Sequence, residues 1–542
     1  MTASDLGPQA GCRAGRFVPL EVLRRDLQRH SDLLADKEAR QQVEAFLKFT
    51  ENERQDAAPE PQMLNEFVRV CVRAGLQLLL ASHGIAHPTY NYFQPFPANA
   101  QGPWDSVPAT WQASTPPIWR LLGFDVSFPV GVPASVLTAT ADWIEYYARQ
   151  GFNVLTYKTV RSRARDAHPS PNWVFLKSLK EPLDPGKAAP TSTEGDTFAW
   201  PENPTAFSMA NSFGVPSFGP EVWQKDVSKA VACLRSGQIL IVSVMATYEE
   251  FAGAAMIEDF VTVAKMARNA GAPAIELNLS CPNTLDPQSG QIKRSLICES
   301  AKDTADIVQA VHDAIAGIPL VVKLSYMPKD RLRDVVEPLL RNGLVRGVSG
   351  INTLQMDVFR SDASPAFVGT ASDSMAPRNP AGVSGVAIRN YGLQFVRSLN
   401  EIREESGLEF DIIGMGGVMN ATDVDEYLKA GAQAVQTATA AFFNPDLPKQ
   451  IYEKFGGVPV PELQLEARAA VLELLAKHGP KPLREIATEV SSLFPAERIL
   501  LENTQAILSE LERQGLVTWE RQKGRSVFRL EPQAEEQLQP TL

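Results

Sequence analysis

The chain has 542 residues, a length that predicts two to four domains rather than one. Apolar residues make up 44% of it and charged residues 21%, which is typical of globular proteins and excludes collagen-like, low-complexity and wholly disordered chains. Its 52 basic and 63 acidic side chains give a formal net charge of −11. An acidic surface repels phosphate backbones, so nucleic-acid binding is not expected without a local basic patch.

Five cysteines are scattered along the chain without a C-x-x-C pair, which indicates neither a disulfide framework nor a zinc or iron–sulfur site. Residues 1–15 lack a basic segment followed by an apolar one, and no apolar run approaches the roughly 18 residues that span a bilayer. We therefore expect a soluble, cytoplasmic protein without a metal site and without a membrane partner.

Residues 1–127 are predicted to form a helical and irregular N-terminal extension. Apolar residues recur at helical spacing over 20–47 and 63–81, and the acidic, proline-containing stretch 51–61 separates them. The proline- and aromatic-rich chain at 88–117 is predicted to pack irregularly over another surface rather than to act as a free linker.

Residues 128–460 alternate between short apolar runs and amphipathic helical patterns. Eight runs are predicted strands: Phe128–Pro133, Asn153–Lys158, Ile239–Met245, Ala274–Asn278, Leu320–Leu324, Gly347–Asn352, Asp411–Met415 and Ala434–Thr437. Near-continuous apolar strands are typical of parallel sheets that are buried on both faces, and eight strand–helix units predict an α/β fold of the (β/α)8 TIM barrel type. A doubly wound open sheet stays the alternative, because a strand count cannot exclude it.

Residues 461–542 are predicted to form a winged-helix-like module. Three helical patterns and the two strands of a hairpin follow one another: 465–476, 482–490, 500–511, 516–521 and 526–530. That fold often binds DNA, but the position of a reading helix, 497–514, carries four glutamates against two arginines. Its net negative charge is opposite to what phosphate contact requires, so a packing or protein-interaction module is favoured.

In a (β/α)8 barrel the functional side chains follow the C-terminal ends of the strands. The fourth predicted strand runs into Asn278-Leu279-Ser280-Cys281-Pro282-Asn283. Amide side chains both donate and accept hydrogen bonds, which suits a ring that bears amides or imides, and a thiol can take up or release a proton. Cys281 is therefore the candidate catalytic residue, while the other four cysteines are predicted to be inert and buried.

Two lysines, Lys158 and Lys323, lie at the ends of the second and fifth predicted strands. An ammonium in a barrel mouth is costly without an anionic partner, so the pair favours a bound anionic or electron-rich cofactor.

Glycine-containing loops follow the seventh strand, where Gly416 and Gly417 lie before the helix cap at Asn420. The eighth strand runs into Ala438 and Thr439, and the segment around Gly385 is a further contributor. Loops after strands seven and eight commonly bind phosphate through backbone N–H groups, so these residues predict a phosphate cradle.

Further amides are expected to face the same cavity. Asn352 and Thr353 follow the sixth strand, and Asn211-Ser212-Phe213-Gly214 precedes the third. A phosphate cradle, two lysines, several asparagines and a cysteine are together typical of a site for a flavin and its substrate.

These motifs resemble the dihydroorotate dehydrogenase family and the related flavin domain of dihydropyrimidine dehydrogenase, over about residues 123–455. The most specific element is NLSCPN at 278–283. The supporting elements follow in family order: PASV at 133–136, KT at 158–159, NSFG at 211–214, VVKL at 321–324, INT at 351–353, GVSGVAIR at 382–389 and IIGMGG at 412–417.

The resemblance implies an FMN group whose phosphate is held by backbone in the glycine loops, with the substrate ring stacked on the flavin. The cofactor contacts that it implies are Ala134, Ser135, Lys158, Thr159, Asn278, Lys323, Gly385, Gly416, Gly417, Ala438 and Thr439. The substrate contacts are Lys158, Asn211, Ser212, Phe213, Gly214, Asn278, Asn283, Asn352 and Thr353. Cys281 corresponds to the base of the soluble class 1 enzymes and would remove the C5 proton of dihydroorotate as hydride leaves C6.

The leading hypothesis is thus an FMN-dependent oxidoreductase that converts dihydroorotate to orotate in pyrimidine biosynthesis. The segment 284–290 lacks the family's usual short lid pattern, and both terminal modules are additions. These departures keep open a repurposed paralogue that acts on another pyrimidine or a conjugated carbonyl compound. A flavoprotein sensor or scaffold, with a homodimer, protein or DNA partner at the C-terminal module, is the other alternative.

Overall fold

The computed structural model describes most of residues 19–103, 119–176, 206–281, 295–369, 376–455 and 459–532, with short gaps inside these ranges, and the segments 111–113 and 189–190. The chain forms two compact units. One comprises residues 1–108 and 115–456, and the other comprises residues 109–114 and 457–542.

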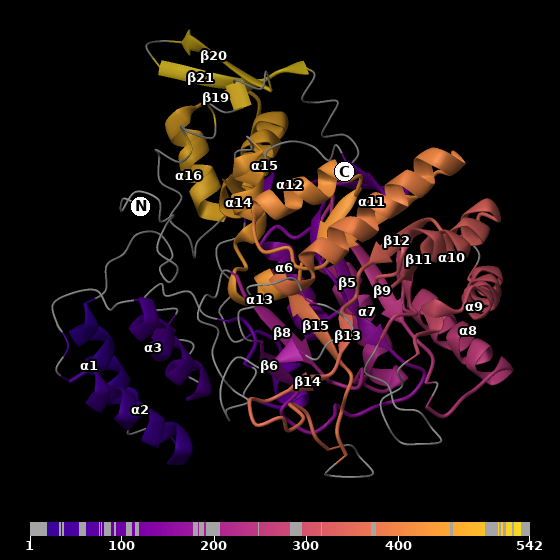
Figure 1. The fold of residues 1–542 in the computed structure, drawn as a ribbon. Coiled ribbons are helices and arrows are strands. Elements are labelled where there is room, and N and C mark those ends of the chain that lie inside the picture. The colour runs from indigo at the N-terminus through magenta and orange to yellow at the C-terminus, as the bar shows by residue number, and fades with distance from the viewer. Residues whose placement is uncertain are drawn as a thin grey trace. The chain divides into compact units, whose positions relative to one another are not determined.

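The centre of the first unit is a closed barrel of eight parallel strands (Figure 1). Its strands are β4 (Val130–Val132), β5 (Val154–Val160), β9 (Ile239–Val244), β10 (Ala274–Asn278), β11 (Leu320–Lys323), β12 (Gly347–Gly350), β16 (Asp411–Met415) and β17 (Ala434–Gln436). β17 pairs in parallel with β4 and closes the ring. The predicted (β/α)8 barrel is confirmed, and the alternative of an open sheet is wrong.

All eight strands lie where the apolar runs predicted them, because residues on both faces of each strand are buried. A hairpin of β2 (Trp119–Leu121) and β3 (Phe124–Val126) fills the barrel interior at the N-terminal ends of the strands. Its Leu121 and Val126 pack among the strand side chains. This plug leaves the opposite end, formed by the C-terminal ends of the strands, to house a site.

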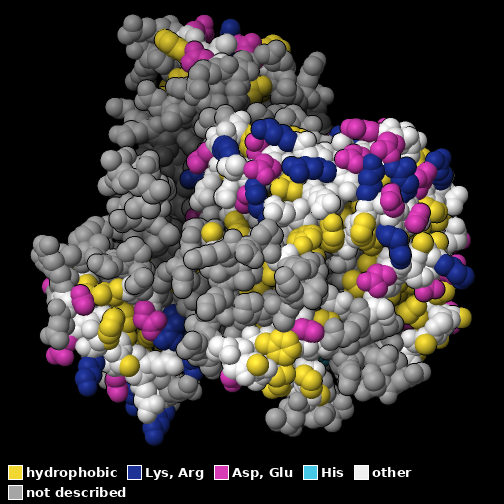
Figure 2. Space-filling view, viewed as in Figure 1, with side chains coloured by type: hydrophobic (Ala, Val, Ile, Leu, Met, Phe, Trp, Pro, Cys, Tyr) yellow, Lys and Arg dark blue, Asp and Glu magenta, His cyan; other side chains and the backbone are white. Residues whose placement is uncertain are grey.

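Helices surround the barrel, and their order follows the predicted strand–helix alternation (Figure 1). They are α6 (Ala141–Arg149), α7 (Pro220–Ala232), α8 (Ala254–Asn269), α9 (Ala301–Ala314), α10 (Lys329–Arg341), α11 (Arg389–Ser406), α12 (Ala421–Lys429), α13 (Thr439–Phe443) and α14 (Leu447–Lys454). Figure 2 shows charges of both signs mixed over the face that carries α10 and α11. Lys329, for example, pairs with Glu401 at 2.6 Å and Glu405 at 2.7 Å.

A second, antiparallel sheet is formed by segments of the loops that follow the strands, in the order β13-β15-β8-β6. Its strands are β13 (Leu354–Met356), β15 (Ala381–Gly385), β8 (Ser208–Asn211) and β6 (Trp173–Phe175). Another short pair joins β7 (Ala189–Pro190) to β14 (Val358–Phe359). The sequence patterns did not predict these strands, which carry Asn211 and Gly385 to the mouth of the barrel.

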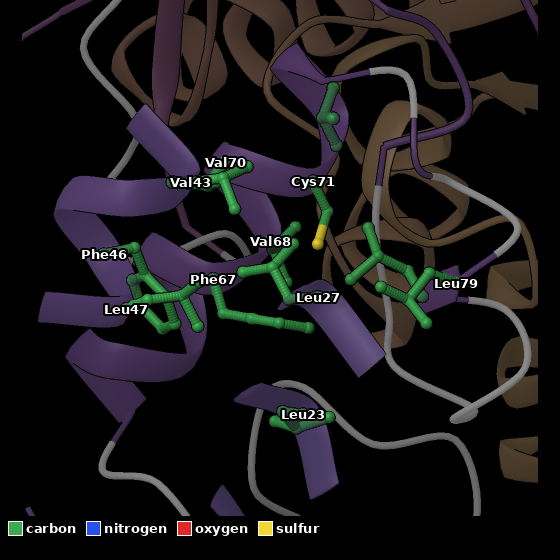
Figure 3. Close-up of a cluster of buried hydrophobic side chains, with 12 residues drawn as sticks. Leu23, Leu27, Val43, Phe46, Leu47, Phe67, Val68, Val70, Cys71 and Leu79 are labelled. Atoms are coloured by element: carbon green, nitrogen blue, oxygen red, sulfur yellow. The ribbon is translucent and has the colours of Figure 1, made fainter. Parts of the chain in front are cut away.

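Three of the helices that the structure describes in the N-terminal extension share a hydrophobic core (Figure 3): α1 (Leu20–Ser31), α2 (Lys37–Phe49) and α3 (Pro61–Arg73). The single helical pattern over 20–47 is therefore two helices, with α1 ending where the Ser31 hydroxyl donates to the Gln28 carbonyl at 2.8 Å.

The second helical pattern, 63–81, is also too long, because α3 ends at Arg73. The Leu76 amide donates to the Cys71 carbonyl at 2.7 Å, an i to i−5 bond of the kind that closes the C-terminal end of a helix. Farther along, the one-turn helix α5 (Phe96–Asn99) lies in the segment 88–103, which packs on the barrel as predicted.

The second unit contains β1 (Trp111–Ala113), β18 (Pro459–Pro461), α15 (Glu462–His478), β19 (Lys481–Pro482), α16 (Leu483–Leu493), β20 (Val517–Gln522) and β21 (Arg525–Leu530). β20 and β21 form the predicted antiparallel hairpin, and β19 adds to β21. Most of the third predicted helix, 500–511, lies outside the described residues. The winged-helix character of this unit stays a prediction.

Candidate functional site

A cavity lies at the C-terminal ends of the barrel strands. The predicted site residues that line it are Ala134, Ser135, Lys158, Thr159, Asn211, Phe213, Asn278, Cys281, Lys323, Asn352, Thr353, Gly385, Gly416, Gly417, Ala438 and Thr439. They come from seven of the barrel strands or the loops after them, and from β8 and β15 or the chain just after β8. The tertiary structure thus brings together residues that are up to about 300 positions apart in the chain.

Two predicted substrate contacts, Ser212 and Gly214, are not among the residues that line this cavity. Their backbone carbonyls instead accept hydrogen bonds from arginines: the buried Arg378 donates to Ser212 at 2.7 Å and the half-buried Arg165 donates to Gly214 at 3.0 Å. Within this segment the side chains of Asn211 and Phe213 line the cavity, which follows from the alternation of faces along extended chain. Asn283 lies outside the described residues.

The amides of Asn278 and Asn352 form a connected polar group around the turn that carries Cys281. The Asn278 amide donates to the Thr159 hydroxyl at 3.0 Å, and its oxygen accepts from Asn352 at 3.4 Å. Asn352 also donates to the Ser280 hydroxyl at 3.3 Å. These bonds hold the amide planes in fixed orientations, as recognition of a ring with several donors and acceptors requires.

Lys158 lies near the end of β5, which extends two residues beyond it, and only 8% of its surface is exposed. Burial lowers the pKa of its ammonium to about 7. The nearby Cys281 thiol acts in the opposite direction, and Arg161 lowers the pKa further. An ammonium held in this way is favoured by an anionic or electron-rich neighbour.

Lys323 is the last residue of β11, and its Nζ lies 3.8 Å from a carboxylate oxygen of Glu276. Both side chains are almost completely buried, and the Ser349 hydroxyl donates to the other Glu276 oxygen at 2.7 Å. Sequence reasoning missed Glu276, although a lone carboxylate inside the apolar run Ala274–Asn278 was a signal that it needs a cationic partner.

Gln436 and Trp173 also line the cavity and were missed. The Gln436 amide donates to the Val154 carbonyl and the Thr156 hydroxyl, both at 2.9 Å, which fixes the side chain inside the barrel. Its position in an otherwise apolar run, Ala434–Gln436, was again the available signal. Trp173 is in β6, which no sequence pattern predicted.

The glycines at one end of the cavity adopt backbone conformations that other residues avoid. Gly385, Gly416 and Gly417 have φ values of +89°, +120° and +70°. A Cβ atom on Gly385 would lie 2.3 Å from the Phe207 carbonyl oxygen, and one on Gly417 would lie 2.7 Å from the carbonyl oxygen of Gly385. Only glycine fits both the φ and the space, which leaves the backbone N–H groups here open to an anionic group.

The comparisons with known proteins agree with this geometry. The family model described as dihydroorotate dehydrogenase matches residues 196–458. The dihydroorotate dehydrogenase of Dictyostelium discoideum is 30% identical over 331 residues, which cover 60% of this chain and 84% of that protein. The chain belongs to the dihydroorotate dehydrogenase family.

Bacterial members of the family show the same relation at lower identity. The catalytic subunit of dihydroorotate dehydrogenase B (NAD(+)) from Bacteroides fragilis is 28% identical over 283 residues, covering 52% of this chain and 78% of that subunit.

A solved structure of ligand-free dihydroorotate dehydrogenase from Eimeria tenella superimposes with a TM-score of 0.49 and 16% identity, over 70% of this chain and 92% of that one.

The cavity fits the flavin on which dihydroorotate dehydrogenases depend. The glycine end supplies a backbone cradle for a phosphate, and the two lysines and the amide group supply cations and donors for an electron-rich ring. The Gln436 Oε1 atom is buried and has no hydrogen-bond partner among the described residues, so a donor on a bound group would satisfy it.

The described residues also bear on two other kinds of site. Among them, no group of three or more histidine, cysteine or acidic side chains is placed to hold a metal ion. In the same part of the chain, no helix is both long enough and apolar enough to cross a membrane.

Proposed function

We propose that the protein oxidises dihydroorotate to orotate, as a step of pyrimidine biosynthesis, with FMN as its flavin and with a cytoplasmic location. The observation that carries the proposal is the presence of Cys281, the asparagine amides and the glycine cradle around one cavity. The names of the relatives support the substrate, and the family supports the flavin.

FMN would bind with its phosphate at Gly385, Gly416, Gly417 and Thr439, where backbone N–H groups can donate to it. Ala134 and Ser135 would lie beneath its ring, and Lys158 and Lys323 beside it. When bound, the flavin supplies the acceptor for the hydride that leaves C6 of the substrate.

The side chains of this protein would carry out the proton chemistry and the positioning. Cys281 would take the C5 proton, because it is the cavity-lining group on the NLSCPN turn that can act as a base. Asn211, Asn278 and Asn352 would hydrogen-bond the amide and carboxylate groups of the ring. Their fixed orientations reduce the entropy lost on reaching the reactive geometry.

The experiment is anaerobic mixing of the purified protein with dihydroorotate, followed by the flavin absorbance. Bleaching is expected in the wild type. In Cys281→Ala its rate should fall by roughly 10²–10⁴-fold, the usual contribution of a general base. The Cys281→Ser variant should retain more activity than Cys281→Ala at high pH, because a hydroxyl needs a more basic medium to lose its proton.

Cys233→Ser is the matched control, since this partly exposed thiol follows α7 and does not line the cavity. Flavin-containing protein that stays yellow with dihydroorotate would reject the substrate, and a panel of uracil, thymine and enones would then test the paralogue hypothesis. Protein that binds no flavin after reconstitution would reject the whole proposal.

A further inference from the structure

Phe96, in the N-terminal extension, lies against the side chain of Lys158. Its ring centroid is 5.7 Å from the Lys158 Nζ atom, and only 4% of the residue is exposed. Lys158 lines the cavity and also a small neighbouring pocket that it shares with Phe96 and Phe218. Phe96 is not among the described residues that line the cavity itself. Its effect on a ligand is therefore indirect, and Lys158 is the cavity-lining cation that its ring contacts.

The segment 88–103 that carries Phe96 is attached to the barrel on both sides of this ring. On one side, the Thr89 amide donates to the Phe442 carbonyl at 2.8 Å. On the other, the Trp143 indole donates to the Asn99 carbonyl at 2.9 Å. Both ends of the short loop are thus tied to helices around the barrel mouth.

The segment is also held internally and by ring stacking. The Asn99 side chain accepts from the Asn91 amide at 2.9 Å and donates to the Asn91 carbonyl at 2.7 Å. The Tyr90 ring stacks on Trp173, a residue that lines the cavity, with 5.4 Å between centroids. These contacts give Phe96 a defined position, which a positioning residue needs.

We propose that Phe96 is a positioning residue of the active site, whose ring fixes the position and the charge of the Lys158 ammonium. The inference rests on the proposed function only for the identity of the ligand that the ammonium meets in the cavity. A cation is attracted to the face of an aromatic ring, and the ring also excludes water from the amine. A residue outside the barrel would then set the electrostatics of a group inside it.

The two effects of the ring act in opposite directions on Lys158. The ring face stabilises the charged form, whereas the bulk of the ring keeps water away and stabilises the neutral form. The other groups that act on this amine are the Cys281 thiol, which favours the charged form, and Arg161, which disfavours it. Phe218 packs on Phe96 at 5.9 Å and adds no charge.

Two substitutions separate these effects. Phe96→Leu keeps most of the bulk and removes the ring face, so the pKa of Lys158 should fall by about half a unit. Phe96→Ala admits water, so the pKa should rise by about one unit or more toward its ordinary value. The measurement is the pH midpoint of acylation of Lys158, followed by peptide mass spectrometry on the protein as purified with its flavin.

Phe46→Leu is the matched control, because Phe46 packs on Phe67 in the core of the extension (Figure 3). Phe46 lines neither of the two pockets that Lys158 lines. Phe46→Leu should leave the midpoint unchanged, and Phe96→Tyr should keep the wild-type midpoint because it keeps a ring. Equal shifts in Phe96→Leu and Phe96→Ala, or no shift in either, would overturn the proposal.

The labelling needs no turnover, so it separates this inference from the proposed function. A shifted midpoint in a protein that does not oxidise dihydroorotate would support the role of Phe96 and reject the substrate. An unshifted midpoint in an enzyme that oxidises dihydroorotate would reject the role of Phe96 and support the substrate.

Discussion

The two ends of the cavity are built in different ways. At the glycine end, defined by Gly385, Gly416 and Gly417, the important feature is the absence of side chains, because the backbone needs positive φ and close approach. At the side-chain end, defined by Lys158, Asn278 and Cys281, the lysine and the amide are buried and held in place at a cost to folding. Removing the charged group of Lys158 should therefore raise the free energy of unfolding, whereas adding a Cβ atom at Gly385 should lower it.

The largest effect on stability is expected at the side-chain end, in Lys158→Met. The folded protein binds the Lys158 proton with a pKa of about 7, and the unfolded chain with a pKa near 10.5. Between these two pH values the unfolded state holds more protons than the folded state. The free-energy cost of burying the charged amine is therefore complete below pH 7 and disappears as the pH rises to 10.5. Flavin-free Lys158→Met should be more stable than wild type by up to roughly 5 kcal/mol at pH 6.

Urea unfolding of the flavin-free proteins at pH 6 and pH 10 measures this difference. The gain should shrink at pH 10, and flavin affinity should fall at both values. A variant that is less stable than the wild type at pH 6 would show that Lys158 stabilises the side-chain end instead of straining it.

The next effect is expected at the glycine end, in Gly385→Ala. The added Cβ has no space beside the Phe207 carbonyl, and φ of +89° is strained for alanine, so the cradle must shift. We expect flavin affinity, measured by fluorescence titration, to fall by roughly 10- to 100-fold. The melting temperature should fall as well.

Gly407→Ala is the control for this substitution. Gly407 has φ of +66° and ends α11, but a Cβ there meets no atom within 4 Å. It should cost stability through φ alone and leave flavin affinity unchanged. Equal flavin loss in both variants would mean that backbone strain, rather than space at the cradle, sets the affinity.

A smaller effect is expected at Asn420, which caps α12 just beyond the glycine end. Its side chain accepts from the Thr422 amide at 2.8 Å and the Asp423 amide at 3.2 Å, so the predicted helix cap is present. Asn420→Ala should cost about 1 kcal/mol of unfolding free energy, as capping residues do. Asn420→Ser should recover most of that loss, and no loss in the alanine variant would show that water replaces the cap.

The smallest effect is expected outside both ends. We propose that residues 461–542, together with residues 109–114 of the predicted extension 1–127, form a module separate from the barrel. Deletion of 461–542 should leave flavin content and the rate of flavin bleaching within about twofold of wild type, a change too small to alter transition-state stabilisation appreciably. A colourless deletion variant would contradict the division and would make the second unit part of what holds the flavin site together.

The sequence alone determined the eight strands and the residues around Cys281, whereas closure of the sheet into a barrel was decided by the pairing of β17 with β4. It could do so because the strands of a parallel barrel are buried on both faces, so their apolar runs are local signals, and because NLSCPN follows one of them directly. It misjudged the ends of the N-terminal helices, where a closing bond from Leu76 to Cys71 outweighed the apolar spacing.

Only the tertiary structure decided which distant residues meet those local motifs. The sheet that carries Asn211 and Gly385 pairs short segments far apart in the chain. The Lys323–Glu276 pair and the ring of Phe96 beside Lys158 likewise depend on packing between elements. Such contacts leave little mark on local sequence, because each partner is selected by the geometry of the folded barrel rather than by its own neighbours in the chain.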